Sequence, residues 1–187
     1  MNRNLFNRSL QELRSARTIT VCAMMGAAAL VLGAYSIYLT PTIKIGFSSL
    51  PNLFVAWLFG PAVGLIFNGT MDILKYFLKP VGGFFPPLTL VTMIAGTIYG
   101  FFFYGKRLTF RRVLAAKLTV AIVCNIVLNT YCLSLLMGKG FWAILPDRIV
   151  KNLIMWPIDS LIFCYVARVL EGAGLFRAFA QRVKSEK

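Results

Sequence analysis

The chain has 187 residues, of which 58% are hydrophobic and only 14% charged, with a mean hydropathy of +0.74 and a formal net charge of +14. Soluble domains are usually about 45–50% apolar and about 25% charged, so the composition excludes an ordinary soluble protein and indicates a polytopic membrane protein of one domain. The basic residues lie mainly at the ends of apolar runs, as membrane flanks do. Membrane topology therefore explains the charge without a nucleic-acid partner.

The residues that usually build metal and catalytic sites are scarce. There is no histidine, which disfavours a transition-metal site and a His-based catalytic triad. The four cysteines lie inside apolar segments without CxxC spacing, so neither a disulfide framework nor a zinc site is indicated. We expect no catalytic residue, no metal site and no cofactor. No ATP-binding P-loop motif is present either, so energy for any transport must come from a partner or an ion gradient.

The first predicted membrane helix covers residues 18–39. This stretch carries no charge, and at about 1.5 Å per residue it is long enough to cross a hydrocarbon core of roughly 30 Å. It is also longer than the apolar region of a signal peptide, which is about 7–15 residues. Arginines in the basic tail 1–17 would hold the N-terminus in the cytoplasm. Ala23 and Ala27 are four apart, a spacing that lets helix backbones approach closely, although internal packing alone explains such a pair.

The next apolar run, residues 45–71, is uncharged and is broken at Gly60-Pro61. Treating that break as a cytoplasmic turn gives six helices and places most of the 20 basic residues inside, whereas a single span would place the later basic clusters outside. The fold class predicted is therefore all-α, a six-transmembrane-helix bundle with both termini in the cytoplasm and a basic tail at 171–187. The predicted helices cover approximately residues 18–39, 47–59, 61–78, 86–104, 113–137 and 147–170. The second of these is short for a full crossing.

Polar side chains at membrane depth are costly and therefore mark candidate sites. Lys75 and Tyr76 share a helical face with Asp72, and Asn125 and Asn129 are four apart. An ion pair within the bundle would explain the first group equally well, and hydrogen bonds between helices would explain the second. Asp159 lies deeper in the last helix, where we favour a structural role and a pairing with Lys117 or another cation.

The strongest group is at the outer end of the last predicted helix. Arg148, Lys151 and Asn152 place two cations and an amide on one side of it, although snorkelling to the interface would explain each cation singly. Other cations and several aromatic residues fall on the same side of the membrane in the predicted topology. Together they suggest an outward pocket for a flat, partly apolar anion, with aromatic walls for a ring system and cations for carboxylates. These additional residues are Lys44, Lys75, Lys79, Phe47, Phe84, Phe85, Tyr131 and Trp142.

Seven short segments, in order along nearly the whole chain, together resemble one known family. They are residues 44–51, 58–64, 72–80, 83–86, 98–100, 128–133 and 148–152, followed by Pro157. The family is the substrate-binding S component of energy-coupling factor (ECF) transporters, and within it the chain looks like the folate-specific branch. The resemblance implies a multi-pass protein of the prokaryotic plasma membrane with a vitamin site at the outer face, under the loop after the first helix.

The resemblance also implies partners. Such a subunit binds its vitamin, joins a transmembrane coupling subunit and two cytoplasmic ATPases, and topples in the membrane to release the vitamin inward. It implies that Ala23 and Ala27 dock the coupling subunit. The candidate folate-binding residues are chosen by side-chain chemistry on the elements that the family uses. They are Lys44, Phe47, Lys75, Tyr76, Phe84, Asn125, Asn129, Trp142, Arg148, Lys151 and Asn152.

Other functions stay open at this stage. An S component for another vitamin, such as pantothenate or riboflavin, fits the same cations, whereas a cationic vitamin such as thiamine fits them poorly. A stand-alone ion-coupled carrier would often show internal repeats, and we find none that is convincing. A membrane enzyme would need a nucleophile and a base or a metal cluster, and none is visible.

Overall fold

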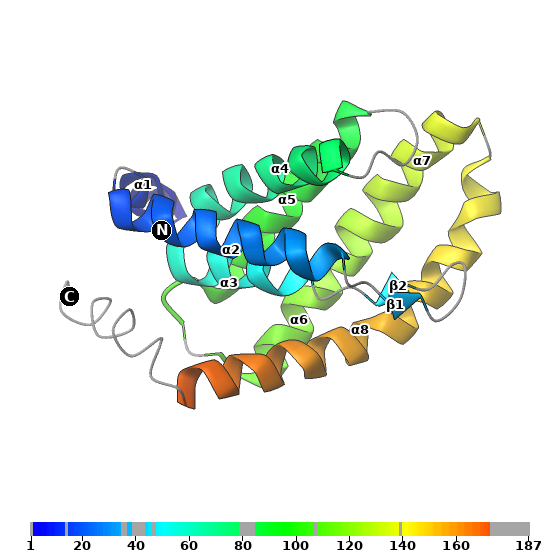
Figure 1. The fold of residues 1–187 in the computed structure, drawn as a ribbon. Coiled ribbons are helices and arrows are strands. Elements are labelled where there is room, and N and C mark those ends of the chain that lie inside the picture. Colours follow the sequence, from blue (N-terminus) through cyan, green and yellow to red (C-terminus); the bar gives the residue numbers. More distant parts are fainter. Residues whose placement is uncertain are drawn as a thin grey trace.

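The structure is a computed structural model, and it describes residues 2–13, 15–34, 37–38, 44–45, 48–78, 85–106, 108–138 and 140–172. Apart from one pair of two-residue strands, the regular secondary structure of these residues is helical. In chain order the elements are α1 (Asn2–Glu12), α2 (Ala16–Ala34), β1 (Ile37–Tyr38), β2 (Lys44–Ile45), α3 (Ser49–Phe59), α4 (Pro61–Leu78), α5 (Pro86–Phe103), α6 (Phe110–Val120), the π-helix η1 (Ala121–Leu128), α7 (Asn129–Met137) and α8 (Phe141–Gly172). α6, η1 and α7 follow one another directly and form one rod (Figure 1).

The first membrane helix differs from the sequence-based expectation at its C-terminal end. It was expected to reach Leu39, but α2 ends at Ala34. Ile37 and Tyr38 instead pair antiparallel with Ile45 and Lys44. β-branched and aromatic residues favour such extended backbone, which explains why an apolar run does not guarantee a helix here.

Two further regions contain more helix than expected. The segment 1–17 was expected to be a basic tail, but most of it forms α1. The last helix was expected to begin at residue 147, but α8 begins at Phe141 and continues through Pro146 and Pro157. Proline removes one backbone donor but does not always end a helix in a membrane bundle, because neighbouring groups satisfy the freed carbonyls.

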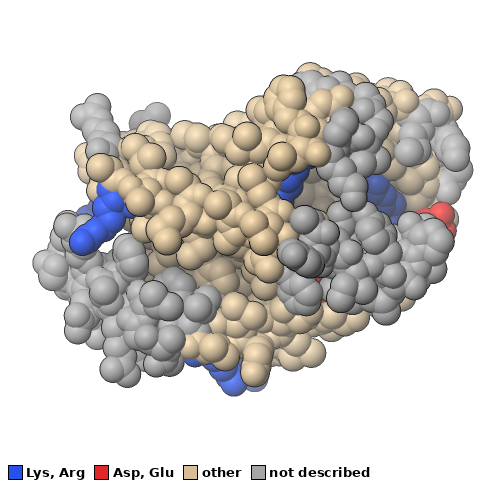
Figure 2. All heavy atoms as spheres, viewed as in Figure 1, with Lys and Arg blue, Asp and Glu red and all other residues tan. Residues whose placement is uncertain are grey.

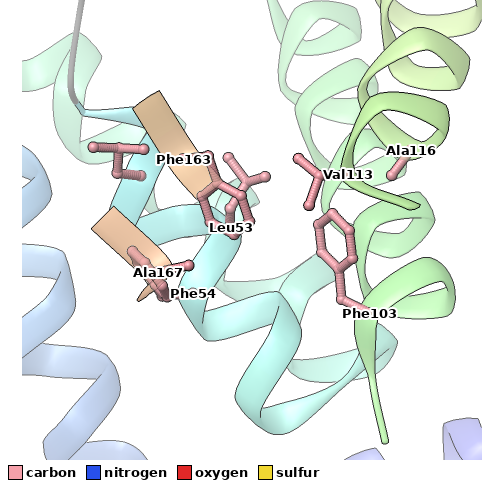
Figure 3. Close-up of a cluster of buried hydrophobic side chains, with 8 residues drawn as sticks. Leu53, Phe54, Phe103, Val113, Ala116, Phe163 and Ala167 are labelled. Carbon is pink, nitrogen blue, oxygen red and sulfur yellow. The ribbon is translucent and has the colours of Figure 1, made fainter. Parts of the chain in front are cut away.

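The buried aromatic core lies where α3, α5, α6 and α8 meet. Phe163 of α8 packs on Phe54 of α3 and on Phe103 of α5, with ring centroids 5.1 and 5.8 Å apart. Val113 and Ala116 of α6 close the cluster from the other side (Figure 3). Because this cluster joins residues of α3 and α8, it fixes the position of α8 against α3.

α4 and α5 pack through glycines that leave almost no side chain between the two backbones. A Cβ atom placed on Gly64 would lie 2.8 Å from the carbonyl oxygen of Gly96, and one placed on Gly96 would collide with the carbonyl oxygen of Gly64. Gly100, one turn further along α5, lies directly against the backbone of Pro61. Gly96 and Gly100 are four apart, the spacing that lets membrane helices pack closely. We call these contacts the glycine seam.

The two ends of the bundle differ in what they carry. Figure 1 shows α1, the start of α2 and the end of α8 at one end, and the β1–β2 hairpin with the ends of α4 and α7 at the other. We call these the terminal end and the hairpin end. Among the residues that the structure describes, four helical stretches are long and apolar enough to cross a membrane, namely Ala16–Gly33, Pro86–Phe103, Phe110–Leu136 and Ile144–Val169.

Gly96→Ala tests the glycine seam. Replacing glycine by alanine inside a helix normally stabilises it, but here the added methyl group meets backbone, and overpacking of this kind costs about 1–3 kcal/mol or more. We expect a clear fall in the unfolding temperature of the detergent-purified chain. Gly140→Ala is the matched control because a Cβ there would have nothing within 4 Å. Equal unfolding temperatures for the two variants would contradict the seam.

Candidate functional site

A side-chain hydrogen bond joins η1 to α8 within the apolar stretches that are long enough to span a membrane. The Asn125 side-chain amide donates to Oδ1 of Asn152 at 3.1 Å, and the Asn152 amide donates to the backbone oxygen of Arg148 at 2.8 Å. Asn125 therefore makes a hydrogen bond between helices, the alternative that the sequence left open for Asn125 and Asn129. η1 is a π-helix, whose wider turn is common at functional sites, and there Asn125 contacts α8.

This contact also places the cations of α8. Arg148, Lys151 and Asn152 lie on successive turns and are all partly buried. Asn152 is held at both ends of its amide, so it fixes the local orientation of the helix surface that carries Arg148 and Lys151. Two cations and a positioned amide in this arrangement can hold carboxylates and hydrogen-bond the edge of a planar ring.

Lys75 and Tyr76 lie on the last turn of α4 and are also partly buried. Asp72, on the same helix, accepts a hydrogen bond from the Thr89 hydroxyl of α5 at 2.8 Å. The Asp72 carboxylate is thus bound to α5, which ties the C-terminal part of α4 to its neighbour. Figure 2 shows Lys and Arg atoms within a recess in the half of the surface that lies toward the hairpin end.

The remaining residues predicted from the sequence lie on other elements. Trp142, at the start of α8, is 80% exposed and contacts the edge of Phe141. Asn129 is partly buried at the start of α7. Lys44 belongs to β2, paired with Tyr38, so its backbone lies in the hairpin. Phe47 and Phe84 lie outside the described residues. The structure therefore brings Asn125, Asn152 and the backbone of Arg148 into contact.

Sequence reasoning missed a second asparagine pair. The Asn52 amide of α3 donates to Oδ1 of Asn68 on α4 at 3.0 Å, and the Asn68 amide donates to the backbone oxygen of Gly64 at 2.8 Å. Within the described residues, Oδ1 of Asn52 is the one buried side-chain polar atom without a hydrogen-bond partner. The signal in the sequence is that Asn52 and Asn68 are amide side chains within a run that is uncharged and mostly apolar.

Lys117 is buried toward the terminal end, at 7% exposure. Its Nζ donates to the backbone oxygen of Asp159 at 2.8 Å and lies 6.0 Å from the centre of the Phe163 ring. The Trp156 indole of α8 donates to the backbone oxygen of Leu114 at 3.0 Å. These bonds hold α6 against α8, which agrees with a structural position for Lys117 and Asp159.

A separate apolar groove of about 500 Å³ lies between α2 and α4. Ala23 and Ala27 are exposed and line it, together with Gly26 of α2 and Ile66 and Thr70 of α4. Within the described ranges, no cluster of three or more His, Cys, Asp or Glu side chains is placed to hold a metal ion. Two candidate binding features thus emerge from the described residues: the cations and amides of α8 and η1, and the groove lined by small residues of α2.

Apolar helices of spanning length make this a multi-pass membrane protein. The family described as "ECF transporter, substrate-specific component" matches residues 17–167. The chain therefore belongs to the S components of ECF transporters, integral proteins of the prokaryotic plasma membrane, and is a transport subunit and not an enzyme.

Its relatives include proteins that carry one shared name. "Folate transporter FolT" of Clostridium novyi (strain NT) is 37% identical over 123 residues, which are 66% of this chain and 72% of that protein. The protein of the same name from Leuconostoc mesenteroides subsp. mesenteroides is 27% identical over 149 residues, which are 76% of this chain and 80% of that protein.

Two solved structures share the fold. The one described as "Crystal structure of FolT bound with folic acid" has a TM-score of 0.73 and 32% identity, covering 81% of this chain and 93% of that one. Another, "Structure and mechanism of the S component of a bacterial ECF transporter", has a TM-score of 0.55 and 23% identity, covering 83% and 96%. The latter likeness shows the fold alone.

A double-mutant cycle tests the Asn125–Asn152 contact. Hydrogen bonds between membrane helices contribute on average about 0.6 kcal/mol, so Asn125→Ala and Asn152→Ala should be non-additive by about that amount in the free energy of unfolding in mixed micelles. Thr119→Ala is the control partner, because its hydroxyl bonds the Ala115 oxygen within its own helix. Additive effects of the two asparagine variants would contradict the contact.

Proposed function

We propose that this chain is the folate-binding S component of an ECF-type vitamin importer. It captures folate at the outer face and delivers it inward when joined to a transmembrane coupling subunit and two cytoplasmic ATPases. The observation that carries the proposal is the likeness over most of both chains to a FolT structure bound with folic acid. The cation and amide arrangement on α8 supports it independently, because folate combines a planar pterin, a benzoate ring and glutamate carboxylates.

The proposed topology has six crossings with both termini in the cytoplasm. The rods run alternately between the two ends of the bundle in Figure 1, and exposed or partly buried arginines gather at the terminal end, as the positive-inside tendency requires. These arginines are Arg8, Arg17, Arg111, Arg112 and Arg168. α3 is short for a crossing, but seven of its eleven residues are buried, so it needs little lipid contact.

The folate site is proposed at the hairpin end, which faces outward in this topology. Arg148 and Lys151 would bind the carboxylates, and Asn125 and Asn152 would meet the polar edge of the ring system. The proposed contributors are Lys44, Phe47, Lys75, Tyr76, Phe84, Asn125, Asn129, Trp142, Arg148, Lys151 and Asn152. Asn52 is an added candidate, since its buried Oδ1 can accept a hydrogen bond.

The coupling subunit is proposed to dock in the groove between α2 and α4. Small residues at Ala23, Gly26 and Ala27 let a second apolar helix approach closely, and α4 supplies the opposite wall. The sequence has no P-loop, so the ATPases that drive import belong to partner subunits. A stand-alone carrier would instead accumulate folate in vesicles that contain only this chain.

Arg148→Ala should weaken folate binding, because it removes a charge-assisted contact worth about 1.5–3 kcal/mol, or roughly 10- to 150-fold in Kd. Titration calorimetry of the detergent-purified chain measures this. Arg111→Ala is the control, since Arg111 is exposed at the terminal end. Unchanged folate affinity in Arg148→Ala removes Arg148 from the site, and tighter binding of pantothenate or riboflavin than of folate would reassign the substrate.

Ala27→Phe should leave folate affinity intact while abolishing co-purification with the coupling subunit, because the ring fills the groove that the partner helix occupies. Ala28→Phe is the matched control, since Ala28 is exposed on the same helix but does not line the groove. A complete complex recovered with Ala27→Phe would exclude the groove as the docking face.

A further inference from the structure

The N-cap position of α4 is a glycine, Gly60, so no side chain at that position can accept hydrogen bonds from the first amides of the helix. Gly60 has a φ of 90°, and a Cβ there would lie 3.0 Å from both the Tyr104 ring and the Ser9 hydroxyl, so only glycine fits. Glycine has no side chain with which to cap the helix. Pro61 has no N–H. The next two amides, those of Ala62 and Val63, lie in the first turn of α4, so the helix itself has no carbonyl oxygen to accept their hydrogen bonds.

Ser9 of α1 supplies the missing cap from more than fifty positions away. Its Oγ accepts hydrogen bonds from the amides of Ala62 and Val63, both at 3.1 Å. The same hydroxyl donates to the carbonyl oxygen of Phe59 at 2.6 Å. Ser9 is 0% exposed. One hydroxyl therefore provides hydrogen-bond partners for a carbonyl at the end of α3 and for two amides at the start of α4. Buried backbone groups at helix ends need such partners.

The position of α1 affects the groove between α2 and α4. Leu13, the residue after α1, lines the groove together with Ile19 and Ala23. Leu13 also packs against the buried cluster that includes Phe67 and Met71. Leu13 thus belongs to the groove lining on the side where α1 ends. α1 lies before residues 17–167, the part of the chain that the ECF family matches.

We propose that Ser9 is a positioning residue, which anchors α1 across the α3–α4 turn and so sets the terminal end of the groove for an apolar helix of the coupling subunit. The proposal rests on the docking role proposed for the groove. Ser9 acts through Leu13 and does not itself touch the partner. Because the hydroxyl lies at the terminal end, the cations of α8 at the hairpin end are independent of it.

Ser9→Ala tests the proposal with Cys22 as a reporter. Cys22 lines the groove, and replacing Cys124, Cys132 and Cys164 leaves it as the only thiol. Loss of a cap contact shifts a local opening equilibrium by roughly fivefold, so we expect maleimide labelling of Cys22 to rise by about that factor. Co-purification with the co-expressed coupling subunit and ATPases should fall, while folate affinity stays within about twofold.

Two further variants separate positioning from general stability. Asn7→Ala, on the exposed face of α1, should leave labelling and assembly unchanged. Leu13→Ala keeps the Ser9 cap but removes the groove contact, so it should raise Cys22 labelling and weaken assembly even if Ser9→Ala folds poorly.

The outcomes distinguish this inference from the proposed function. Wild-type labelling and assembly in both Ser9→Ala and Leu13→Ala would overturn the inference, as would a loss of folate affinity in Ser9→Ala that parallels the loss of assembly. If Ala27→Phe assembles normally while Ser9→Ala still raises Cys22 labelling, the docking role fails but the anchoring of α1 at the groove is upheld.

Discussion

The rest of the structure depends on the backbone contact between α4 and α5. Inside a bilayer, apolar helices gain little by leaving lipid for each other, so association needs close packing or polar contacts. The glycine seam provides the first, because Gly64 meets Gly96 and Pro61 meets Gly100 without intervening side chains. α3 then packs on this pair, with the Asn52–Asn68 hydrogen bond fixing its position along α4. A close-packed unit of three helices results, against which the other helices are arranged.

The second half of the bundle is held by polar bonds instead of glycines. Asn125 bonds Asn152, Lys117 bonds the backbone of Asp159, and Trp156 bonds the backbone of Leu114. All three join the rod of α6, η1 and α7 to α8. With little water available in the membrane, each polar group must find a protein partner, so these bonds fix the rotation of α8 about its axis. That rotation determines which way Arg148 and Lys151 are presented.

The sequence was most informative where local chemistry decides the structure. Proline begins helices and glycine ends them, so the break at Gly60-Pro61 was visible, and α3 and α4 meet there. The cations of α8 were visible because charge at membrane depth is rare. Contacts between distant segments were not visible. Asn125 and Asn152 are brought together only by packing, and α1 is a short polar helix whose one buried hydroxyl, that of Ser9, bonds the start of α4.

The groove is formed by α2 and α4, whereas the cations Arg148 and Lys151 lie on α8. α2 leaves Ala23, Ala27 and Met24 exposed, and only 17% of its spanning stretch is buried within the chain. Exposed leucine or isoleucine would pack well with lipid chains, whereas a row of small residues leaves a shallow surface that another helix fills better. The cations of α8 are tied to η1 and lie away from this surface. A partner helix in the groove, as proposed above, would therefore not contact the side chains proposed to bind folate on α8, because within the described part of the chain the groove is lined by Leu13 and residues of α2 and α4 alone.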